Sequence, residues 1–136
     1  MKRNAFTLVE ILIVVIILGI LAAIVVPQFT EASGDAKVSA LASDLQTVRN
    51  QLQLYKIQHN NSYPDKTIVT QLTTKTKEDG SAGGTLGPYL TTFPSNPFTD
   101  SATVDADGTQ GDGSHAWYYN TSTGEFTPDD ADHSSM

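Results

Sequence analysis

The most apolar stretch of the chain lies near its start. Residues 6–26 read FTLVEILIVVIILGILAAIVV, and from Ile11 to Val26 no side chain is polar. An α-helix rises about 1.5 Å per residue, so this stretch reaches roughly 30 Å, the thickness of a bilayer's hydrocarbon core. Basic residues stand at positions 2 and 3, and the next is Lys37. The positive-inside bias therefore predicts a single span with a cytoplasmic N-terminus and the rest of the chain outside.

Beyond Val26 the wholly apolar pattern gives way to an amphipathic one. Apolar residues recur at spacings of three and four, at Val38, Leu41, Leu45, Val48, Leu52 and Tyr55. This stripe is typical of one buried helical face, and Pro27 is expected to kink the helix because it lacks a backbone donor. We predict one helix from about residue 6 to about residue 58. A coiled coil is the alternative, but the stripe covers under three heptads without consistent flanking charge pairs, which favours packing on the chain's own sheet.

The remaining residues predict short elements. The segment TIVTQLT, residues 67–73, fits a short helix, and aromatic-rich runs at 116–120 and 124–127 fit a hairpin around residues 121–123. The residues from about Asp129 to the end are expected to be a frayed tail. The predicted fold is α+β, in which a long helix packs on a small antiparallel sheet of about two to four strands.

One acid, Glu10, interrupts the apolar stretch. A secretory signal peptide and a plain membrane anchor are both possible explanations of the stretch. An acid within a membrane helix costs about 2.5–3.5 kcal/mol, however, so neither explanation gives this carboxylate a purpose. Its presence indicates a partner.

The N-terminal sequence MKRNA followed by FTLVE resembles the type IV pilin family, which includes the pseudopilins of type II secretion. The resemblance implies that residues 1–5 are a leader, which a prepilin peptidase removes between Ala5 and Phe6, and that the new Phe6 amine is methylated. The family usually has Gly where this chain has Ala5. The resemblance also implies that Glu10 pairs with the Phe6 amine of a neighbouring subunit, and it gives Pro27 the family's helix kink.

Later segments resemble the major pseudopilins in particular. They are GPYL, FPSNPF and WYYNTSTGEF, and the chain has no cysteine. Many type IV pilins close a C-terminal loop with a disulfide, whereas major pseudopilins lack one and bind calcium. The resemblance thus implies a structural subunit of a type II secretion pseudopilus, with the inner membrane holding its helix and the periplasm its globular domain, residues 27–136. The implied partners are copies of itself, an inner-membrane assembly platform and minor pseudopilins. A surface pilin for adhesion, motility or DNA uptake, or a non-polymerising anchored binding domain, are the alternatives.

The charges are unevenly distributed. The formal net charge is −7, and after Lys77 there are ten acids and no Lys or Arg. Such a half repels nucleic acid, which we do not expect as a partner, and suits either cations or a basic partner. Four of these acids lie among glycines and hydroxyls in residues 99–114, and they are the candidate calcium ligands: Asp100, Asp105, Asp107 and Asp112. They do not form an EF-hand loop, because the third acid and the final Glu are missing at the required spacing.

Nothing in the chain indicates an enzyme. There is no Gly-rich phosphate loop, no GxSxG and no HExxH. The histidines, His59, His115 and His133, are scattered, and we expect each to be an ordinary surface or partly buried residue.

Overall fold

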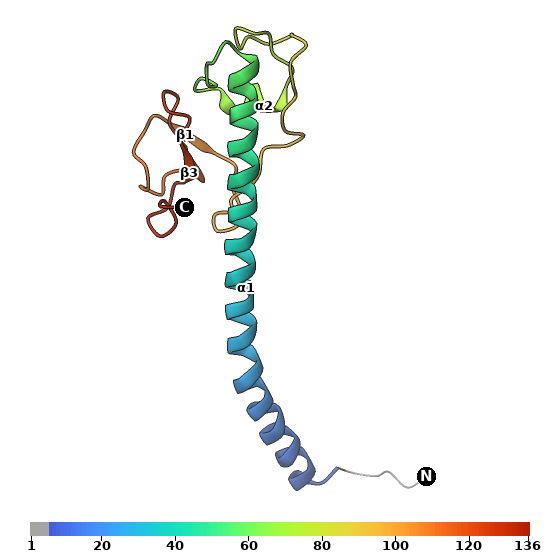
Figure 1. The fold of residues 1–136 in the computed structure, drawn as a ribbon. Helices are drawn as coiled ribbons and strands as arrows, with labels where there is room; N and C mark the ends of the chain where they lie inside the picture. Colours follow the sequence, from blue (N-terminus) through green and yellow to red (C-terminus); the bar gives the residue numbers. More distant parts are fainter. Residues whose placement is uncertain (1–5) are drawn as a thin grey trace. The chain divides into compact units, whose positions relative to one another are not determined.

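The structure, a computed structural model, describes residues 6–136 and leaves out the side chains of residues 27, 29 and 31. The predicted leader, and with it Ala5, lies outside the described residues. The chain divides into two compact units, Met1–Ala36 and Lys37–Met136. One helix of 51 residues, α1 (Leu8–Gln58), contributes to both (Figure 1).

The first unit contains the apolar part of α1. Every described side chain from Phe6 to Val26 is exposed, and residues 8–26 form a candidate membrane span of 19 residues with a mean hydropathy of 3.3. A helix that is apolar all round satisfies its backbone internally and leaves its side chains to a nonaqueous neighbour. The helix continues through Pro27, so the predicted kink does not end it. The kink itself stays a prediction.

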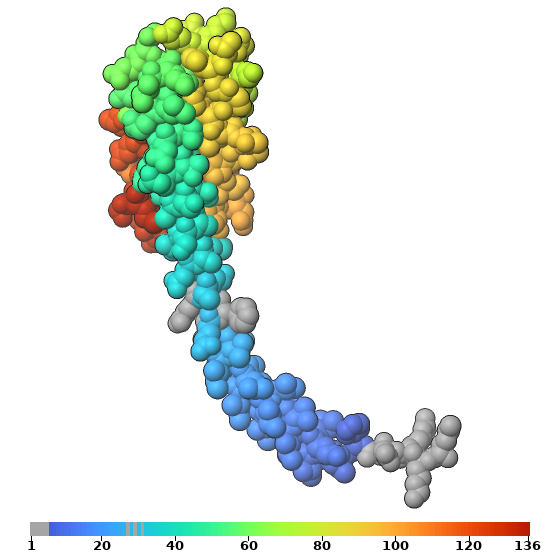
Figure 2. Space-filling model, turned by 45° about the vertical axis from the view of Figure 1, so that its right-hand side comes forward, coloured from blue at the N-terminus to red at the C-terminus, as the bar shows by residue number. Residues whose placement is uncertain are grey.

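The second unit is built on the other half of α1. The predicted stripe is confirmed from Leu41 to Tyr55, whose five members are all buried. Val38 is 40 % exposed, because the core begins one turn later than the periodicity predicts. The stripe packs against Ile68, Leu72, Leu90, Ala116, Trp117, Tyr119 and Phe126. In Figure 2, residues from the middle and from the end of the chain flank this half of the helix.

The predicted short helix is confirmed as α2 (Ile68–Thr73), and the predicted hairpin as two strands. The strands are β2 (Trp117–Tyr119) and β3 (Phe126–Pro128), and they run antiparallel, with Tyr119 opposite Phe126. All three residues of each strand are buried, as expected of the aromatic cover over the helix.

A third strand, β1 (Val104–Ala106), was not predicted and makes the sheet mixed. The order is β1-β2-β3, and β1 runs parallel to β2, with Val104 opposite Trp117. The expectation of a wholly antiparallel sheet is therefore wrong, although the α+β fold is confirmed. The physical reason is the loop of residues 107–116, which carries the chain back to the start of the next strand instead of turning it directly.

The only tryptophan, Trp117, lies at the centre of this arrangement. It is fully buried, its ring stacks on Phe126 at a centroid distance of 5.1 Å, and its indole N–H donates to the Pro94 carbonyl over 3.1 Å. A buried indole needs such an acceptor, so the loop before β1 is fixed to the hairpin. 

The end of the chain differs from the frayed tail that we expected. Asp129 is 0 % exposed, and its carbonyl accepts a hydrogen bond from the Gly113 amide. Further along, the His133 ring stacks on Phe98 at a centroid distance of 4.2 Å. Residues 129–133 are therefore held on the second unit by their contacts with Gly113 and Phe98.

Candidate functional site

The first site is the start of α1. Thr7 precedes the first helical residue, and its hydroxyl accepts a hydrogen bond from the Glu10 amide over 3.2 Å. The Glu10 carboxylate in turn accepts from the Thr7 amide and from its hydroxyl, each over 2.8 Å. This reciprocal arrangement is a capping box, in which two helix-end donors are satisfied by side chains three residues apart. Glu10 therefore caps its own helix.

The capping box uses only half of the carboxylate. Both hydrogen bonds go to Oε2, and no described residue donates to Oε1. The carboxylate also lies in the first turn, where the helix dipole favours negative charge. Phe6, the residue that precedes the cap, is 81 % exposed. Glu10 itself is also exposed, so a positive group from another molecule has access to the carboxylate.

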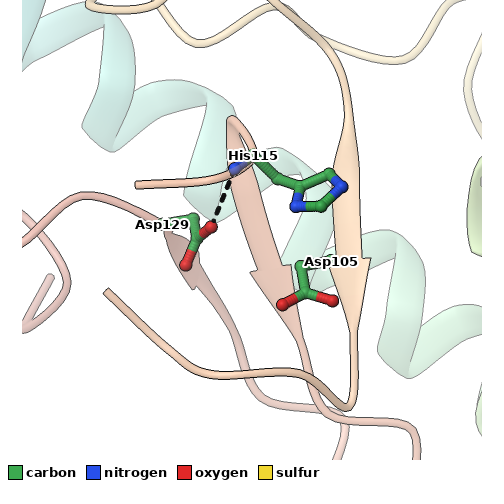
Figure 3. Close-up of side chains that lie close together, drawn as sticks. All are labelled: Asp105, His115 and Asp129. Atoms are coloured by element: carbon green, nitrogen blue, oxygen red, sulfur yellow. Dashed lines mark hydrogen bonds between the residues drawn. The ribbon is translucent and has the colours of Figure 1, made fainter. Parts of the chain in front are cut away.

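The second site lies on the sheet. Asp105, His115 and Asp129 each present one ligand atom within 4.8 Å of the other two (Figure 3). They come from β1, from the residues just before β2, and from the residue after β3. Because β1 is parallel to β2 and β3 is antiparallel to it, the register brings these positions together.

Each member has a different environment. Both oxygens of the buried Asp129 carboxylate accept backbone hydrogen bonds, from the Gly111 amide over 2.9 Å and from the His115 amide over 3.0 Å. His115 is half-buried, and its Nδ1 lies 2.8 Å from the Ser114 hydroxyl. The half-buried Asp105 carboxylate accepts no hydrogen bond from the described residues.

Asp105 also lies directly against the backbone of the following turn. A Cβ added to Gly108 would lie 1.8 Å from Asp105 Oδ2, so any residue other than glycine would push the carboxylate away. Glycine at position 108 therefore permits the position that Asp105 takes beside the other two residues.

The other three predicted calcium ligands lie outside this cluster. Asp107 accepts hydrogen bonds from the Thr121 amide and hydroxyl, which lower the pKa of its carboxyl, and Lys66 lies 3.8 Å away. The Asp112 carboxylate accepts hydrogen bonds from Ser114, and the hydroxyl and amide of Ser114 lower the pKa of Asp112. Asp100 occupies a turn with a φ of 51°. Within residues 6–136, only the cluster of Asp105, His115 and Asp129 brings three potential metal-ligating side chains together, and Asp105 is the only one of the four predicted ligands that belongs to it.

The sequence pointed to Asp105 but not to its two neighbours. His115 was expected to be an ordinary residue, and Asp129 was assigned to the tail. The signal that identifies Asp129 is its position directly after a strand of the hairpin. The capping box, in contrast, was readable from the sequence as Thr7 followed three residues later by Glu10.

Calcium does not suit this donor set well. It takes about 6–8 oxygen ligands, whereas the cluster offers two carboxylates and an imidazole nitrogen. Backbone carbonyls and water would have to supply most of the coordination.

A long helix with an exposed apolar first half, a capped acid near its start and a small sheet on its second half define the protein as pilin-like. The model of the prokaryotic N-terminal methylation motif matches residues 1–26, and that of type II secretion system protein G matches residues 28–121. The chain belongs to the family of type II secretion system protein G, the major pseudopilins. This family is structural and not enzymatic.

Curated relatives agree with the family models. The chain is 34 % identical over 112 residues to type II secretion system core protein G of Pseudomonas aeruginosa, covering 81 % of this chain and 78 % of that protein. It is 31 % identical over 129 residues to the protein of the same name from Vibrio cholerae, covering 81 % and 85 %. No solved structure matched the chain significantly. The methylation motif implies processing by a prepilin peptidase, and the apolar helix is compatible with membrane anchoring.

Proposed function

We propose that the chain polymerises through residues 6–26 into the filament of a type II secretion pseudopilus. The observation that carries the proposal is the surface of residues 6–26. All of these side chains are exposed, and all except Thr7 and Glu10 are apolar. Lipid covers this surface before assembly, and the helices of neighbouring copies cover it afterwards. The second unit has its own core and does not need a neighbour to fold.

The orientation follows from the charges at the N-terminus. The basic residues at positions 2 and 3 favour a cytoplasmic start, which puts the second unit in the periplasm and the apolar half of α1 in the inner membrane. The peptidase cuts after Ala5, and the mature chain begins at methylated Phe6. An inner-membrane platform then adds subunits to the filament, with minor pseudopilins as further partners.

Glu10 sets the register between neighbouring copies. The free Oε1 accepts the positive Phe6 amine of the next subunit, while Oε2 continues to cap the helix. An unpaired charge in lipid is costly, whereas a hydrogen-bonded pair is much less so, and only one register brings the two groups together. Glu10 can therefore pair with the neighbouring subunit without giving up its hydrogen bonds to Thr7.

Two substitutions separate these roles of Glu10. Glu10→Val removes the cap and the charge, and we expect the full chain to insert into the membrane but to form no filaments. Glu10→Gln keeps an acceptor for Thr7 but removes the charge, and we expect the same loss of filaments. Both are measured as the yield of sheared filaments from cells that express the secretion machinery, with membrane fractionation as the check on insertion.

Thr7→Val is the matched control, because it removes the capping hydroxyl and leaves the carboxylate. We expect filament yield close to that of the unsubstituted chain. If Glu10→Gln formed filaments normally and Thr7→Val did not, the cap and not the charge pair would explain Glu10. The mass of the N-terminal peptide from cells checks processing, which predicts a start at methylated Phe6.

We also propose that a divalent cation stabilises the acidic half of the second unit. Calcium is the ion that the family implies, and the candidate acids are Asp105 with Asp129, and Asp100, Asp107 and Asp112 nearby in sequence. The support is the absence of any Lys or Arg after Lys77 and of any cysteine in the chain. A ligand at about 100 times its Kd stabilises the folded state by about 2.7 kcal/mol. The full chain in detergent should therefore melt at a higher temperature with the cation than with chelator, and equal melting temperatures would contradict the proposal.

A further inference from the structure

We propose that Asp105, His115 and Asp129 form a site for a transition-metal ion of the zinc type. The inference rests on the proposed stabilisation by a divalent cation, and it names a different ion and adds the imidazole of His115 to the carboxylates of Asp105 and Asp129. An imidazole and two carboxylates are the side chains that bind Zn²⁺, whereas Ca²⁺ takes oxygen atoms almost exclusively. His115 is therefore the residue that decides which ion binds.

The three residues are brought together by the sheet and not by one loop. Asp105 belongs to β1, His115 precedes β2 by two residues, and Asp129 follows β3 directly. Their ligand atoms lie within 4.8 Å of one another, and Figure 3 shows the imidazole next to the Asp105 carboxylate, with the Asp129 carboxylate beside them. One ligand lies in a strand and the other two lie next to the ends of its paired neighbours, so the backbone register of the sheet holds the parts of the site together before the ion arrives.

Among the residues that the structure describes, neither carboxylate of this cluster forms a salt bridge with Lys or Arg. Asp129 is fully buried, and its partners are two backbone amides. Asp105 accepts no hydrogen bond within the described part of the chain. The nearest basic residue before the cluster in sequence is Lys77, and none follows it. Two carboxylates that approach each other in a partly buried place repel unless a cation lies between them.

The geometry requires a small closure on binding. Zn²⁺ binds His nitrogen and Asp oxygen at about 2.0–2.2 Å, which places tetrahedral ligand atoms about 3.4 Å apart. The present separations extend to 4.8 Å, so side-chain rotation supplies the difference. Asp105 is free to move because it has no hydrogen bond to break, and water completes the coordination as the fourth ligand.

The test uses the full chain in detergent, stripped of metal with chelator and titrated with Zn²⁺, Co²⁺ and Ca²⁺ in separate experiments. We expect one equivalent of Zn²⁺ to bind at least about 100-fold more tightly than Ca²⁺, and Co²⁺ to give the visible absorption of a tetrahedral site. His115→Ala should weaken Zn²⁺ binding at least 10-fold and abolish the Co²⁺ bands. Asp105→Asn should do the same without unfolding the protein, because this carboxylate has no hydrogen-bond partner among residues 6–136.

His133→Ala is the matched control, because His133 lies beside another acid, with its Nδ1 2.6 Å from Asp130 Oδ1. Zn²⁺ binding should survive this change. If the control lost the ion and His115→Ala kept it, or if Ca²⁺ bound more tightly than Zn²⁺, the inference would be wrong while the proposed stabilisation by a cation would stand. If none of these ions bound or raised the melting temperature, both would fail.

Discussion

The two halves of α1 are made of the same backbone but meet opposite surroundings. From residue 8 to residue 26 the helix is apolar on every side and buries none of its side chains within the chain. From Leu41 to Tyr55 it is apolar on one stripe only, and that stripe is buried by the chain's own sheet, loops and short helix. Both halves are helical, so the helix itself does not distinguish them.

The difference shows that the width of the apolar surface on a helix indicates whether the same chain can cover it. A stripe as wide as one face can be covered by the residues that follow it in the same chain, whereas a wholly apolar helix needs cover on all sides. The first half therefore leaves its apolar surface uncovered, whereas the stripe of the second half is covered by other residues of the same chain.

The largest effect separates the halves by their contribution to the free energy of unfolding. Leu52 is fully buried, and Leu52→Ala should lower the stability of the second unit by about 2–5 kcal/mol, because the truncation leaves a cavity. Leu54, on the same helix, is 42 % exposed, and Leu54→Ala should change it by less than about 1 kcal/mol. Urea titration of the full chain in detergent measures both.

Leu18→Ala extends the comparison to the first half. Leu18 is exposed, so unfolding of the second unit in urea should not respond to it. If this substitution lowered the stability as much as Leu52→Ala, the two halves would not be independent in the way that their burial indicates.

A smaller effect is expected at high pH, from tyrosine on the covered half. Burial raises the pKa of Tyr55 to about 12, from about 10 for an exposed tyrosine. Its contribution to stability is complete below pH 10 and is lost as the pH rises towards 12, because the unfolded chain releases the proton first. Tyr55→Phe should therefore flatten the loss of stability between pH 10 and pH 12.

Tyr63→Phe is the matched comparison for that window. A hydrogen bond from Gln53 lowers the pKa of Tyr63, so this group favours the folded state as the pH rises. Its removal should steepen the alkaline loss of stability, and urea titrations at several pH values measure both slopes. Identical slopes for the two variants would show that burial of Tyr55 does not control its ionisation.

The smallest effects concern two acids of the second unit that should respond in opposite directions. Burial raises the pKa of Asp44, so its charged form favours the unfolded chain, and Asp44→Asn should slightly increase stability at pH 7. Hydrogen bonds from the Ser81 hydroxyl and amide lower the pKa of Asp79, whose contribution is present above about pH 4 and is lost as the pH falls below that. Asp79→Asn should slightly decrease stability at pH 7, and at pH 2 both differences should disappear from urea titrations.

The elements with local signals were predictable from the sequence. The apolar stretch, the stripe from Leu41 to Tyr55, the short helix α2 and the hairpin of β2 and β3 each have a periodicity or a turn within a few residues. The strand β1 has none, because Asp105 stands between Val104 and Ala106 in an acidic, glycine-rich segment. Its pairing depends on β2 beyond a ten-residue loop, which periodicity does not reveal.

The functional sites follow the same rule as the fold, because only the site with a local sequence signal was predictable. Glu10 was conspicuous because an acid in an apolar helix is costly, and its capping box follows from Thr7 three residues earlier. The cluster on the sheet was only partly predictable, since Asp105 belonged to an acidic segment but Asp129 becomes its neighbour through β1. Because the sequence does not reveal the parallel pairing of β1 with β2, it also does not reveal which residues this pairing brings close to Asp105.

Trp117 gives the molecule an internal fluorescent reporter. The chain's single indole is fully buried against Phe126 and donates its N–H to the Pro94 carbonyl, so its emission should be shifted to short wavelengths and should move to longer ones when water reaches it. No tryptophan lies in the apolar half of α1. The intrinsic fluorescence of the whole chain therefore records the unfolding of the second unit alone, even when detergent, lipid or other subunits surround the first.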